Sequence, residues 1–415
     1  MDDYRRNSRS PGGQTSQAMR ILFLALEPPF PPNDGGRIRT YNILKQVARR
    51  HEVTLVTFAP PQQQAERLEA LRPLCAGVFA LPLPRPPRRT LLHKAAGLFS
   101  RRPISLARYR SPEMARLLHT LARNHYDVAH IDQIYLAQYI HDLHPLPAVL
   151  THHNVEAEIQ QRQLQARPPS LRRLLDTLEC RRWRFYEVAV SRRSAALACV
   201  SERDAAYFRQ RVPNVPIWVV PNGVDTQAYR PPETEPEEAL LLYTGRMDYF
   251  PNVDAMDWFC REIWPRIRQE VPSVRLQIVG RDPLPQVQSL GAQPGIEVVG
   301  TVADTRPYLS RAAVYIAPLR LGGGTRLKVL EAMAMGRPIV STPLGCEGLD
   351  LHPGEDLLVA ETAEEFAQAT VRLLRDFALG RRLGMQARRT AETRFDWTQI
   401  AREQERAYQA ALDRQ

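Results

Sequence analysis

The chain has 415 residues, of which 44% are hydrophobic and 24% charged, so its composition is that of a globular protein and excludes wholesale disorder. No apolar run approaches the roughly 18 residues that a membrane-spanning helix needs, and the first 18 residues lack the apolar core of a secretion signal. The net charge of +11, from 56 Lys and Arg against 45 Asp and Glu, predicts attraction to anions such as nucleotides, nucleic acid or an acidic membrane.

The cysteines are odd in number, widely spaced and without a Cys-x-x-Cys pair. They stand at Cys75, Cys180, Cys199, Cys260 and Cys346. This pattern argues against a disulfide framework or a zinc site, and it favours a cytoplasmic protein.

Strand-like and helical segments alternate along the first half of the chain. Residues 1–18 are polar and aperiodic, which predicts a disordered tail, and Ile38–Arg49 has a helical pattern. The runs that predict buried strands are Arg20–Leu26, Val53–Phe58, Val78–Leu83, Val128–Ile131, Ala148–Thr151 and Ala196–Val200. Such alternation predicts a parallel sheet with helices on both faces.

The same alternation restarts after a segment rich in proline and acid, Pro231–Glu238, which is typical of a linker. The flanking and later strand-like runs are Ile217–Val220, Ala239–Thr244, Val274–Val279, Glu297–Val299, Ala313–Ala317, Pro338–Ser341 and Leu357–Val359. Trp397–Leu412 is an amphipathic helix candidate. We therefore expect an α/β protein with two doubly wound, Rossmann-like domains, residues 19–222 and 239–395, joined by a linker over 223–238. Ligands of such sheets bind outside the carboxyl ends of the strands, here in a cleft between the domains.

A glycine pair follows the first predicted strand, in Asn33-Asp34-Gly35-Gly36-Arg37-Ile38-Arg39. Paired glycines let a backbone approach a ligand, a following helix N-terminus attracts anions, and the two arginines add charge. The alternative is a plain strand-to-helix turn. The pattern G-x-G-x-x-G is not met, so the dinucleotide-binding fingerprint is absent.

Two histidines follow the predicted strand Ala148–Thr151, in Thr151-His152-His153-Asn154-Val155-Glu156. A histidine at a strand end in a cleft can donate to, or orient, a reacting group. One alternative is a metal site made of His152, His153, Glu156 and Glu158, which is disfavoured because adjacent histidines rarely point at one ion. The other is a histidine that only caps the following helix.

The strongest motif runs from Pro318 to Pro338 and contains three consecutive glycines before a predicted helix. Glycine-rich backbone at a helix N-terminus cradles phosphates, and Thr325 is a plausible N-cap. Lys328 is one of only three lysines in the chain, the others being Lys45 and Lys94. Glu331 lies one turn inside an apolar helix, where a ribose diol is a suitable partner. The P-loop pattern G-x-x-x-x-G-K-[ST] is not met.

A further phosphate-binding candidate is Arg246, in Thr244-Gly245-Arg246-Met247-Asp248 after the strand Ala239–Thr244. Its guanidinium can hold a phosphate bidentately, although a plain surface arginine is a serious alternative. The sequence contains no Asp-x-Asp, so we expect no metal at a diphosphate. The charge of a leaving group would instead fall on Arg, Lys and backbone N–H groups.

From Arg20 to about Trp397 the chain resembles the GT-B glycosyltransferases of the large retaining family 4, also called group 1. The motifs that carry this resemblance are Gly35-Gly36, His153–Glu156, Val200-Ser201-Glu202, Val220–Asp225, Gly245-Arg246 and Leu330–Val340. Pro251-Asn252 with Thr342–Gly348 is similar to a subgroup that builds bacterial exopolysaccharide.

The resemblance implies two Rossmann-like domains, with the donor nucleotide held mainly by the second and a C-terminal helix, 396–415, that crosses back to the first. It implies Glu331 at the ribose, Arg246 and a lysine at the diphosphate, and His153 near the transferred sugar. The predicted catalytic residues are His153, Arg246 and Lys328. The predicted donor-binding residues are Gly35, Gly36, Asn222, Arg246, Gly323, Gly324, Thr325, Arg326, Lys328 and Glu331. The predicted acceptor-binding residues are Arg37 and Arg39.

Two positions depart from the family pattern. The E-x7-E motif would put its first glutamate at position 323, where the chain has glycine, and this leaves the donor sugar undetermined. The usual lysine a few residues after Gly-Arg is absent, with Asn252 in that region. We hypothesise that Lys328 or Arg326 supplies the missing charge.

Residues 84–123 are strongly basic, with apolar side chains between the arginines. Such a stretch can lie on an anionic membrane surface, and a solvated surface is an equal alternative. A nucleic-acid partner is disfavoured because no binding motif and no row of aromatic platforms is present.

The sequence thus predicts a cytoplasmic glycosyltransferase, with peripheral association at the inner face of the cytoplasmic membrane as an addition. It would move a sugar from a nucleotide-sugar to a glycan or lipid-linked acceptor, without a cofactor or metal. The rivals are a degenerate nucleotide-sugar-binding protein, a nucleotide-sugar epimerase and a phosphorylase. A nicotinamide dehydrogenase is disfavoured, because neither domain carries the dinucleotide glycine pattern.

Overall fold

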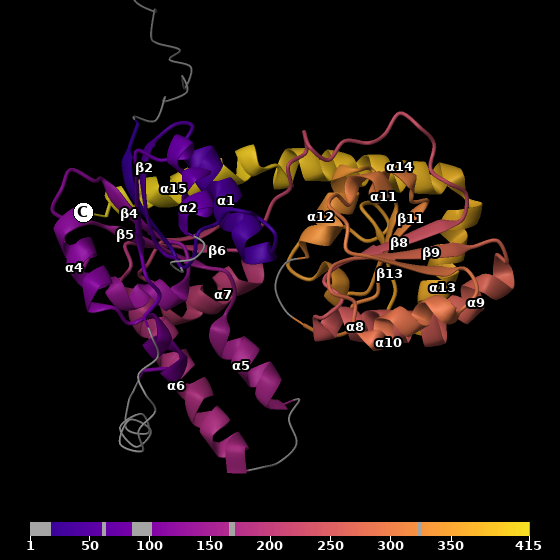
Figure 1. Ribbon diagram of the computed structural model, residues 1–415, viewed down its shortest axis with the longest axis horizontal. Helices are drawn as coiled ribbons and strands as arrows, with labels where there is room; N and C mark the ends of the chain where they lie inside the picture. The colour runs from indigo at the N-terminus through magenta and orange to yellow at the C-terminus, as the bar shows by residue number, and fades with distance from the viewer. Residues whose placement is uncertain (1–17, 60–63, 85–101, 166–170, 323–325, 415) are drawn as a thin grey trace, which may run out of the picture.

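The computed structural model describes residues 18–59, 64–84, 102–165, 171–322 and 326–414, which form two α/β lobes (Figure 1). Several sequence-based predictions lie outside the described residues. They concern the tail up to residue 17, Gly323, Gly324, Thr325 and residues 85–101 of the basic stretch.

The first lobe is built on a seven-stranded parallel sheet of order β3-β2-β1-β4-β5-β6-β7. Its strands are β1 (Arg20–Ala25), β2 (Glu52–Phe58), β3 (Gly77–Leu81), β4 (Val128–Ile131), β5 (Ala148–His152), β6 (Ala196–Cys199) and β7 (Ile217–Val219). Its helices are α1 (Gly35–Val47), α2 (Gln64–Glu69), α4 (Pro112–Leu121), α5 (Glu156–Gln165), α6 (Leu171–Arg193) and α7 (Glu202–Arg211). All seven strands fall where the apolar runs predicted them. Continuous apolar runs form them because the central strands are covered on both faces.

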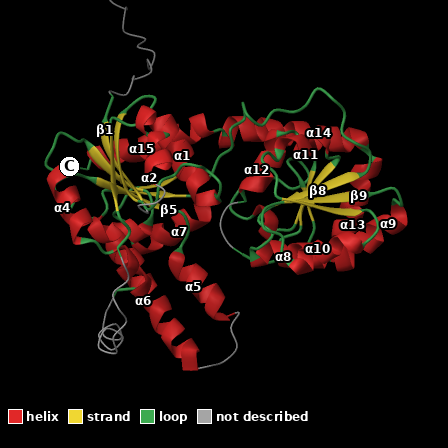
Figure 2. Cartoon of the chain, viewed as in Figure 1, coloured by secondary structure: helices red, strands yellow, loops and turns green. Residues whose placement is uncertain are grey.

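The second lobe holds a six-stranded parallel sheet of order β10-β9-β8-β11-β12-β13. Its strands are β8 (Leu240–Thr244), β9 (Arg275–Val279), β10 (Ile296–Gly300), β11 (Val314–Ala317), β12 (Ile339–Ser341) and β13 (Leu358–Val359). Its helices are α8 (Phe250–Trp258), α9 (Trp264–Glu270), α10 (Pro285–Gln288), α11 (Arg306–Arg311), α12 (Leu327–Ala334), α13 (Ala363–Arg375) and α14 (Phe377–Thr390). Helices cover both faces of each sheet (Figure 2).

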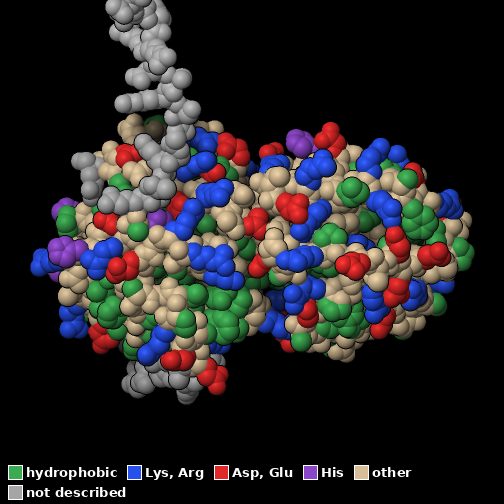
Figure 3. Space-filling view, turned by 90° about the horizontal axis from the view of Figure 1, so that it is seen from above, with side chains coloured by type: hydrophobic (Ala, Val, Ile, Leu, Met, Phe, Trp, Pro, Cys, Tyr) green, Lys and Arg blue, Asp and Glu red, His purple; other side chains and the backbone are tan. Residues whose placement is uncertain are grey.

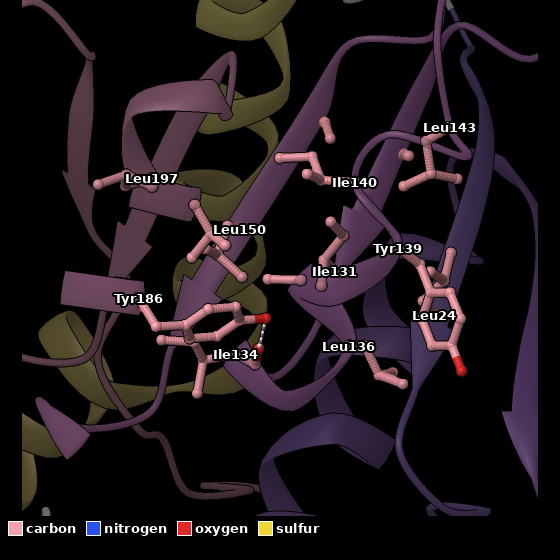
Figure 4. Packing of buried hydrophobic residues seen from close by; sticks show 14 of the residues in the cluster. Leu24, Ile131, Ile134, Leu136, Tyr139, Ile140, Leu143, Leu150, Tyr186 and Leu197 are labelled. Carbon is pink, nitrogen blue, oxygen red and sulfur yellow. Dashed lines mark hydrogen bonds between the residues drawn. The ribbon is translucent and has the colours of Figure 1, made fainter. Parts of the chain in front are cut away.

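Each sheet buries one apolar cluster on either face. In the first lobe, Leu150 and Ile131 from neighbouring strands lie near Tyr186 of α6, and Leu24 lies further along the same cluster, beside Tyr139 (Figure 4). The two clusters of a lobe fix its helices against the sheet, and so they fix the loops that leave the carboxyl ends of the strands.

The chain crosses between the lobes twice, and the two crossings touch. Val224 N donates to the Phe395 carbonyl at 2.8 Å, and a Cβ at Gly223 would lie 2.7 Å from that carbonyl oxygen. Glycine is therefore required at position 223. The last helix, α15 (Trp397–Leu412), has the predicted bounds, and its buried Trp397 and Tyr408 pack against the first sheet.

Charged side chains of both signs are interspersed over the face seen in Figure 3. The excess positive charge is therefore not gathered into one patch on this face. Among the described helices, none is long and apolar enough to cross a membrane.

Candidate functional site

Loops that carry several of the predicted site residues leave each sheet where its strand order reverses. In the first sheet this point lies between β1 and β4, which lead to the Gly35-Gly36 loop and to Asp132. In the second it lies between β8 and β11, which lead to Gly245 and to the glycine loop before α12. These crevices are the usual ligand sites of doubly wound sheets.

The two crevices face each other across the gap between the lobes. A Cβ at Gly35 would lie 3.6 Å from Leu327 Cδ1, so the first-lobe loop touches the start of α12. Asp34, the N-cap of α1, interacts electrostatically with Arg246 of the second lobe. The fold thus brings the glycine pair, Arg246 and α12 close together between the lobes.

Lys328 reaches from α12 to the end of β8. Its Nζ donates to Tyr243 Oη and to Asn252 Oδ1, both at 2.9 Å, and it stands 4.3 Å from the centroid of the Tyr243 ring. A Cβ at Gly245 would lie only 2.7 Å from this Nζ. The amine therefore occupies the space that the glycine leaves open, next to Asn252.

Burial lowers the pKa of Lys328 to about 7; the nearby Arg326 lowers it further, and Glu331 opposes the shift. In the described part of the chain, no carboxylate lies within ion-pair distance of Nζ. A desolvated amine in this position is suited to receive an anion, because the anion would restore its charge.

Glu331 lies one turn further along α12. Burial raises the pKa of its carboxyl to about 7, while a hydrogen bond from Tyr229 and the charge of Lys328 oppose the shift. Tyr229 belongs to the segment between the lobes. A carboxyl group with a pKa close to neutral pH, buried in this crevice, can accept hydrogen bonds from a diol.

Arg246 is half exposed and is held by its neighbour. Its Nε and Nη2 donate to the two carboxylate oxygens of Asp248 at 3.0 and 2.5 Å. This hydrogen bond is the main cause that raises the pKa of Arg246. A phosphate at this point would compete with Asp248 for the same fork of donors.

The helix α12 begins one residue later than expected. Its N-cap is Arg326, which makes no side-chain capping bond, whereas Thr325, the predicted N-cap, lies outside the described residues. Arg326 is buried, and burial lowers its pKa. Its carbonyl and side chain lie at the start of the helix, where the backbone N–H groups favour anions.

A buried polar cluster lies under the first-lobe side of the cleft. His153 Nε2 is 3.3 Å from Asp132 Oδ1, and Thr40 Oγ1 donates to Asp132 Oδ2 at 2.6 Å. His130 Nε2 is 3.6 Å from the same carboxylate, and His130 Nδ1 is 2.7 Å from the hydroxyl of Tyr408. Asp132 thus holds His153 in place from the strand beside it.

Burial alone would raise the pKa of Asp132. The charge of His153 and hydrogen bonds from His130 and His153 outweigh this effect, so the pKa of the Asp132 carboxyl lies well below its usual range. The carboxylate is therefore ionised over the physiological range. Sequence reasoning missed Asp132, although it directly follows a predicted strand. It missed Tyr408 because this residue arrives from the far end of the chain.

His152 points away from His153. Its Nε2 is 3.0 Å from Ser191 Oγ, and its ring lies against Phe208 with centroids 4.0 Å apart. Among the described residues, no group of three or more His, Cys, Asp or Glu is placed to hold a metal ion.

The two predicted acceptor residues differ in placement. Arg37 is partly buried and pairs with Glu27, and its Nη1 donates to Asn33 Oδ1 at 3.2 Å. Arg39 is 2% exposed and donates to the carbonyls of Val220 and Pro221, each at 2.8 Å, and to Asn222 Oδ1 at 3.0 Å. This placement gives Arg39 and Asn222 a structural role at the first crossing, so the expected acceptor contact of Arg39 is not retained.

Ion pairs link the lobes beside the site. Arg203 of α7 binds Glu347 of the second lobe and Glu158 of α5, the latter at 2.9 Å. Arg162 Nη2 lies 3.7 Å from Glu347. Together they border a small pocket next to His153, lined also by Asn154, Val200, Ser201 and Gly348.

The comparisons with known proteins match both lobes. A model described as Glycosyltransferase Family 4 matches residues 33–228, and one described as Glycosyl transferases group 1 matches residues 238–376. The phosphatidyl-myo-inositol mannosyltransferase of Mycobacterium leprae is 32% identical over 208 residues, which are 46% of this chain and 52% of the relative. The chain spans 35% to 55% of the length of the curated relatives that it matches.

Solved structures match nearly the whole chain. Sucrose-phosphate synthase from Thermosynechococcus elongatus has a TM-score of 0.67 at 18% identity, over 94% of this chain and 98% of that one. Anabaena HepE in complex with UDP and glucose has a TM-score of 0.64 at 16% identity, with the same coverage. Identities this low show the fold alone. Since the two family models account for both lobes, the chain belongs to the group 1, or family 4, glycosyltransferases, with the GT-B fold.

Proposed function

We propose that the chain transfers a hexosyl group from a nucleoside-diphosphate sugar to a hydroxyl of a glycan or lipid-linked acceptor. The pairing of Lys328 and Glu331 on α12 carries this proposal. A buried amine with two neutral hydrogen-bond partners stands one turn from a buried carboxyl, at the crevice of the second lobe. The diphosphate of a donor suits the amine, and its ribose diol suits the carboxyl.

In the proposed donor complex, Lys328 and Arg246 neutralise the diphosphate, and the N–H groups at the start of α12 add to them. Lys328 takes the place of the lysine that the family carries after Gly-Arg. The hydrogen bond between its Nζ and Asn252 supports this replacement, because Asn252 stands in that region of the sequence.

The reaction breaks the bond between the anomeric carbon and the diphosphate oxygen. The acceptor oxygen bonds to the same carbon, and the acceptor proton leaves with the released diphosphate. The negative charge that develops on the leaving oxygen falls on Lys328 and Arg246, and each charge-assisted hydrogen bond contributes about 1.5–3 kcal/mol. Retention of anomeric configuration follows the family by analogy, and no step needs a metal.

His153 contacts the transferred sugar in this proposal, and Asp132 is its positioning residue. The contact between them, 3.3 Å from Nε2 of His153 to Oδ1 of Asp132, fixes the imidazole just after the end of β5. A fixed donor or acceptor there orients the sugar for attack.

The acceptor and the cellular setting extend the proposal. We assign the chain to cell-surface glycan or exopolysaccharide synthesis in the cytoplasm. The name of the Mycobacterium leprae relative, a phosphatidyl-myo-inositol mannosyltransferase, supports a lipid-linked acceptor.

The test is product formation from radiolabelled nucleotide-sugars, with lipid extract or oligosaccharide as acceptor. Transfer by the wild type, lost in Lys328→Met but kept in Lys45→Met, would support the proposal. Isomerised donor would indicate an epimerase instead, and sugar 1-phosphate would indicate a phosphorylase. Tight donor binding without any product would indicate a degenerate binder, which the glycine at position 323 favours.

A further inference from the structure

A large groove lies on the outer side of α6, away from the cleft. It has a volume of about 1240 Å³, and its walls come from α6, the loop around Ile140 and the end of α7. Seven arginines line it: Arg102, Arg181, Arg182, Arg184, Arg192, Arg193 and Arg211. Among the described residues that line it there is no aspartate or glutamate, and Glu179, outside the groove, lies 3.5 Å from Arg182.

Large apolar side chains stand exposed among these arginines. Phe185 is 74% exposed, Leu175 53% and Leu178 41%. Ile104, 55% exposed, lies beside them because its backbone N–H donates to Glu179 of α6. Exposed apolar groups gathered in one place mark an interaction surface.

The two kinds of side chain share one stripe of the helix. Leu178, Arg181, Phe185, Ala189 and Arg192 follow one another at spacings of three or four residues, so they lie along the same face. A helical face with apolar residues between arginines is the pattern of a segment that lies at an anionic membrane surface.

We propose that this α6 groove docks the protein on a membrane leaflet rich in anionic phospholipid. Charge complementarity selects this occupant over two others. The segment 85–101 of this chain carries five basic residues and no acid, so the arginines repel it. A second copy would bring the same arginines to the same place and is repelled for the same reason.

The docked helix is tied to the proposed active site. On its inner side, α6 places the carboxylate of Glu187 against the N-terminus of α5, where it accepts the N–H groups of Glu156 and Ala157 at 2.6 and 3.0 Å. These residues directly follow His153 and Asn154. Figure 1 shows α5 beside α6, both extending from the first lobe. Docking at α6 would thus be linked, through Glu187 and the N-terminus of α5, to the loop that carries His153.

The inference deepens the proposed function, but its test does not depend on transfer. The full chain, without donor, is floated with vesicles of equimolar phosphatidylglycerol and phosphatidylcholine, or of phosphatidylcholine alone. We expect binding to the anionic vesicles only, and weaker binding at higher salt because the charges are screened. The double variant Arg181→Glu, Phe185→Ser should bind at least about tenfold more weakly.

A matched control carries Arg382→Glu and Met385→Ser on α14 of the second lobe, where both residues are exposed. Its vesicle binding should equal that of the wild type, and circular dichroism should show all three proteins folded. Three results would overturn the inference: no binding of the wild type to anionic vesicles, equal binding of the α6 variant, or equal loss in the control. Wild type that ignores vesicles but binds a single-stranded oligonucleotide would overturn it in favour of a nucleic-acid surface.

Discussion

Replacing Lys328 by methionine is expected to weaken donor binding and, at the same time, to stabilise the empty protein. The amine gives up water on folding, and its hydrogen-bond partners among the described residues, Tyr243 and Asn252, are both neutral. Its pKa of about 7 lies well below the ordinary lysine value of 10.5, and this difference corresponds to roughly 3–5 kcal/mol of lost stability. Methionine fills similar space without the charge.

The sign of the pH dependence follows from the same shift. Below pH 7 the amine is charged in both the folded and the unfolded chain, so the full cost is present. Between pH 7 and 10.5 only the unfolded chain holds the proton, and the stability of the wild type rises with pH. The gain in melting temperature from Lys328→Met should therefore be largest at or below pH 7 and shrink as the pH rises.

Donor binding should change in the opposite sense. The lost charge-assisted hydrogen bond corresponds to about 1.5–3 kcal/mol, so nucleotide should bind about 10- to 150-fold more weakly. Because a bound diphosphate favours the charged amine, the affinity of the wild type for nucleotide should also fall above pH 7. This pH dependence should be absent in the variant. Calorimetry and thermal melting measure both effects, with Lys45→Met as the control. A variant that binds donor like the wild type, or melts lower at pH 7, would refute this account.

Three further substitutions probe the rest of the site. Glu331→Gln should weaken the binding of nucleoside diphosphates but not that of inorganic diphosphate, which lacks a ribose. Calorimetry with both ligands measures this, and an equal loss of affinity for the two would contradict the prediction. Gly245→Ala places a Cβ 2.7 Å from Lys328 Nζ, so it should weaken donor binding by a similar factor as Lys328→Met, and unchanged affinity would show that the amine acts elsewhere. Asp132→Asn should lower kcat through His153 with little change in the KM for the donor, and a pure KM effect in steady-state kinetics would argue against a positioning role. The variant should also be less stable than the wild type above about pH 4, where the lowered pKa of the Asp132 carboxyl contributes its full stabilisation.

The sheets could be predicted from the sequence because their strands are continuous apolar runs. Segments such as Arg20–Leu26 and Val53–Phe58 are mostly apolar, which is typical of a parallel strand that is buried on both faces. The same holds for α15, whose bounds follow from an amphipathic pattern. The places of Arg246, Lys328 and Glu331 in the second lobe could also be expected, because Arg246 lies just after β8 and the other two lie on α12, the helix after β11. Their roles in donor binding stay predictions.

Other features depend on contacts between distant segments. The sequence shows Arg39 only as a charge after two glycines, but its partners Val220 and Pro221 arrive from the end of the first lobe. The polar cluster around Asp132 is likewise assembled from α1, β4, β5 and α15. The start of α12 also depends on its surroundings, because its N-cap Arg326 is buried and Lys328 in its first turn reaches Tyr243 of β8.

The most direct test of the account is a melting-temperature panel of UDP-, GDP-, ADP- and dTDP-sugars, without added metal, on the wild type and Glu331→Ala. We predict that one nucleotide raises the melting temperature of the wild type and leaves that of the variant unchanged. Stabilisation of both proteins to the same extent, or of neither by any nucleotide, would contradict the assignment of the donor site to α12.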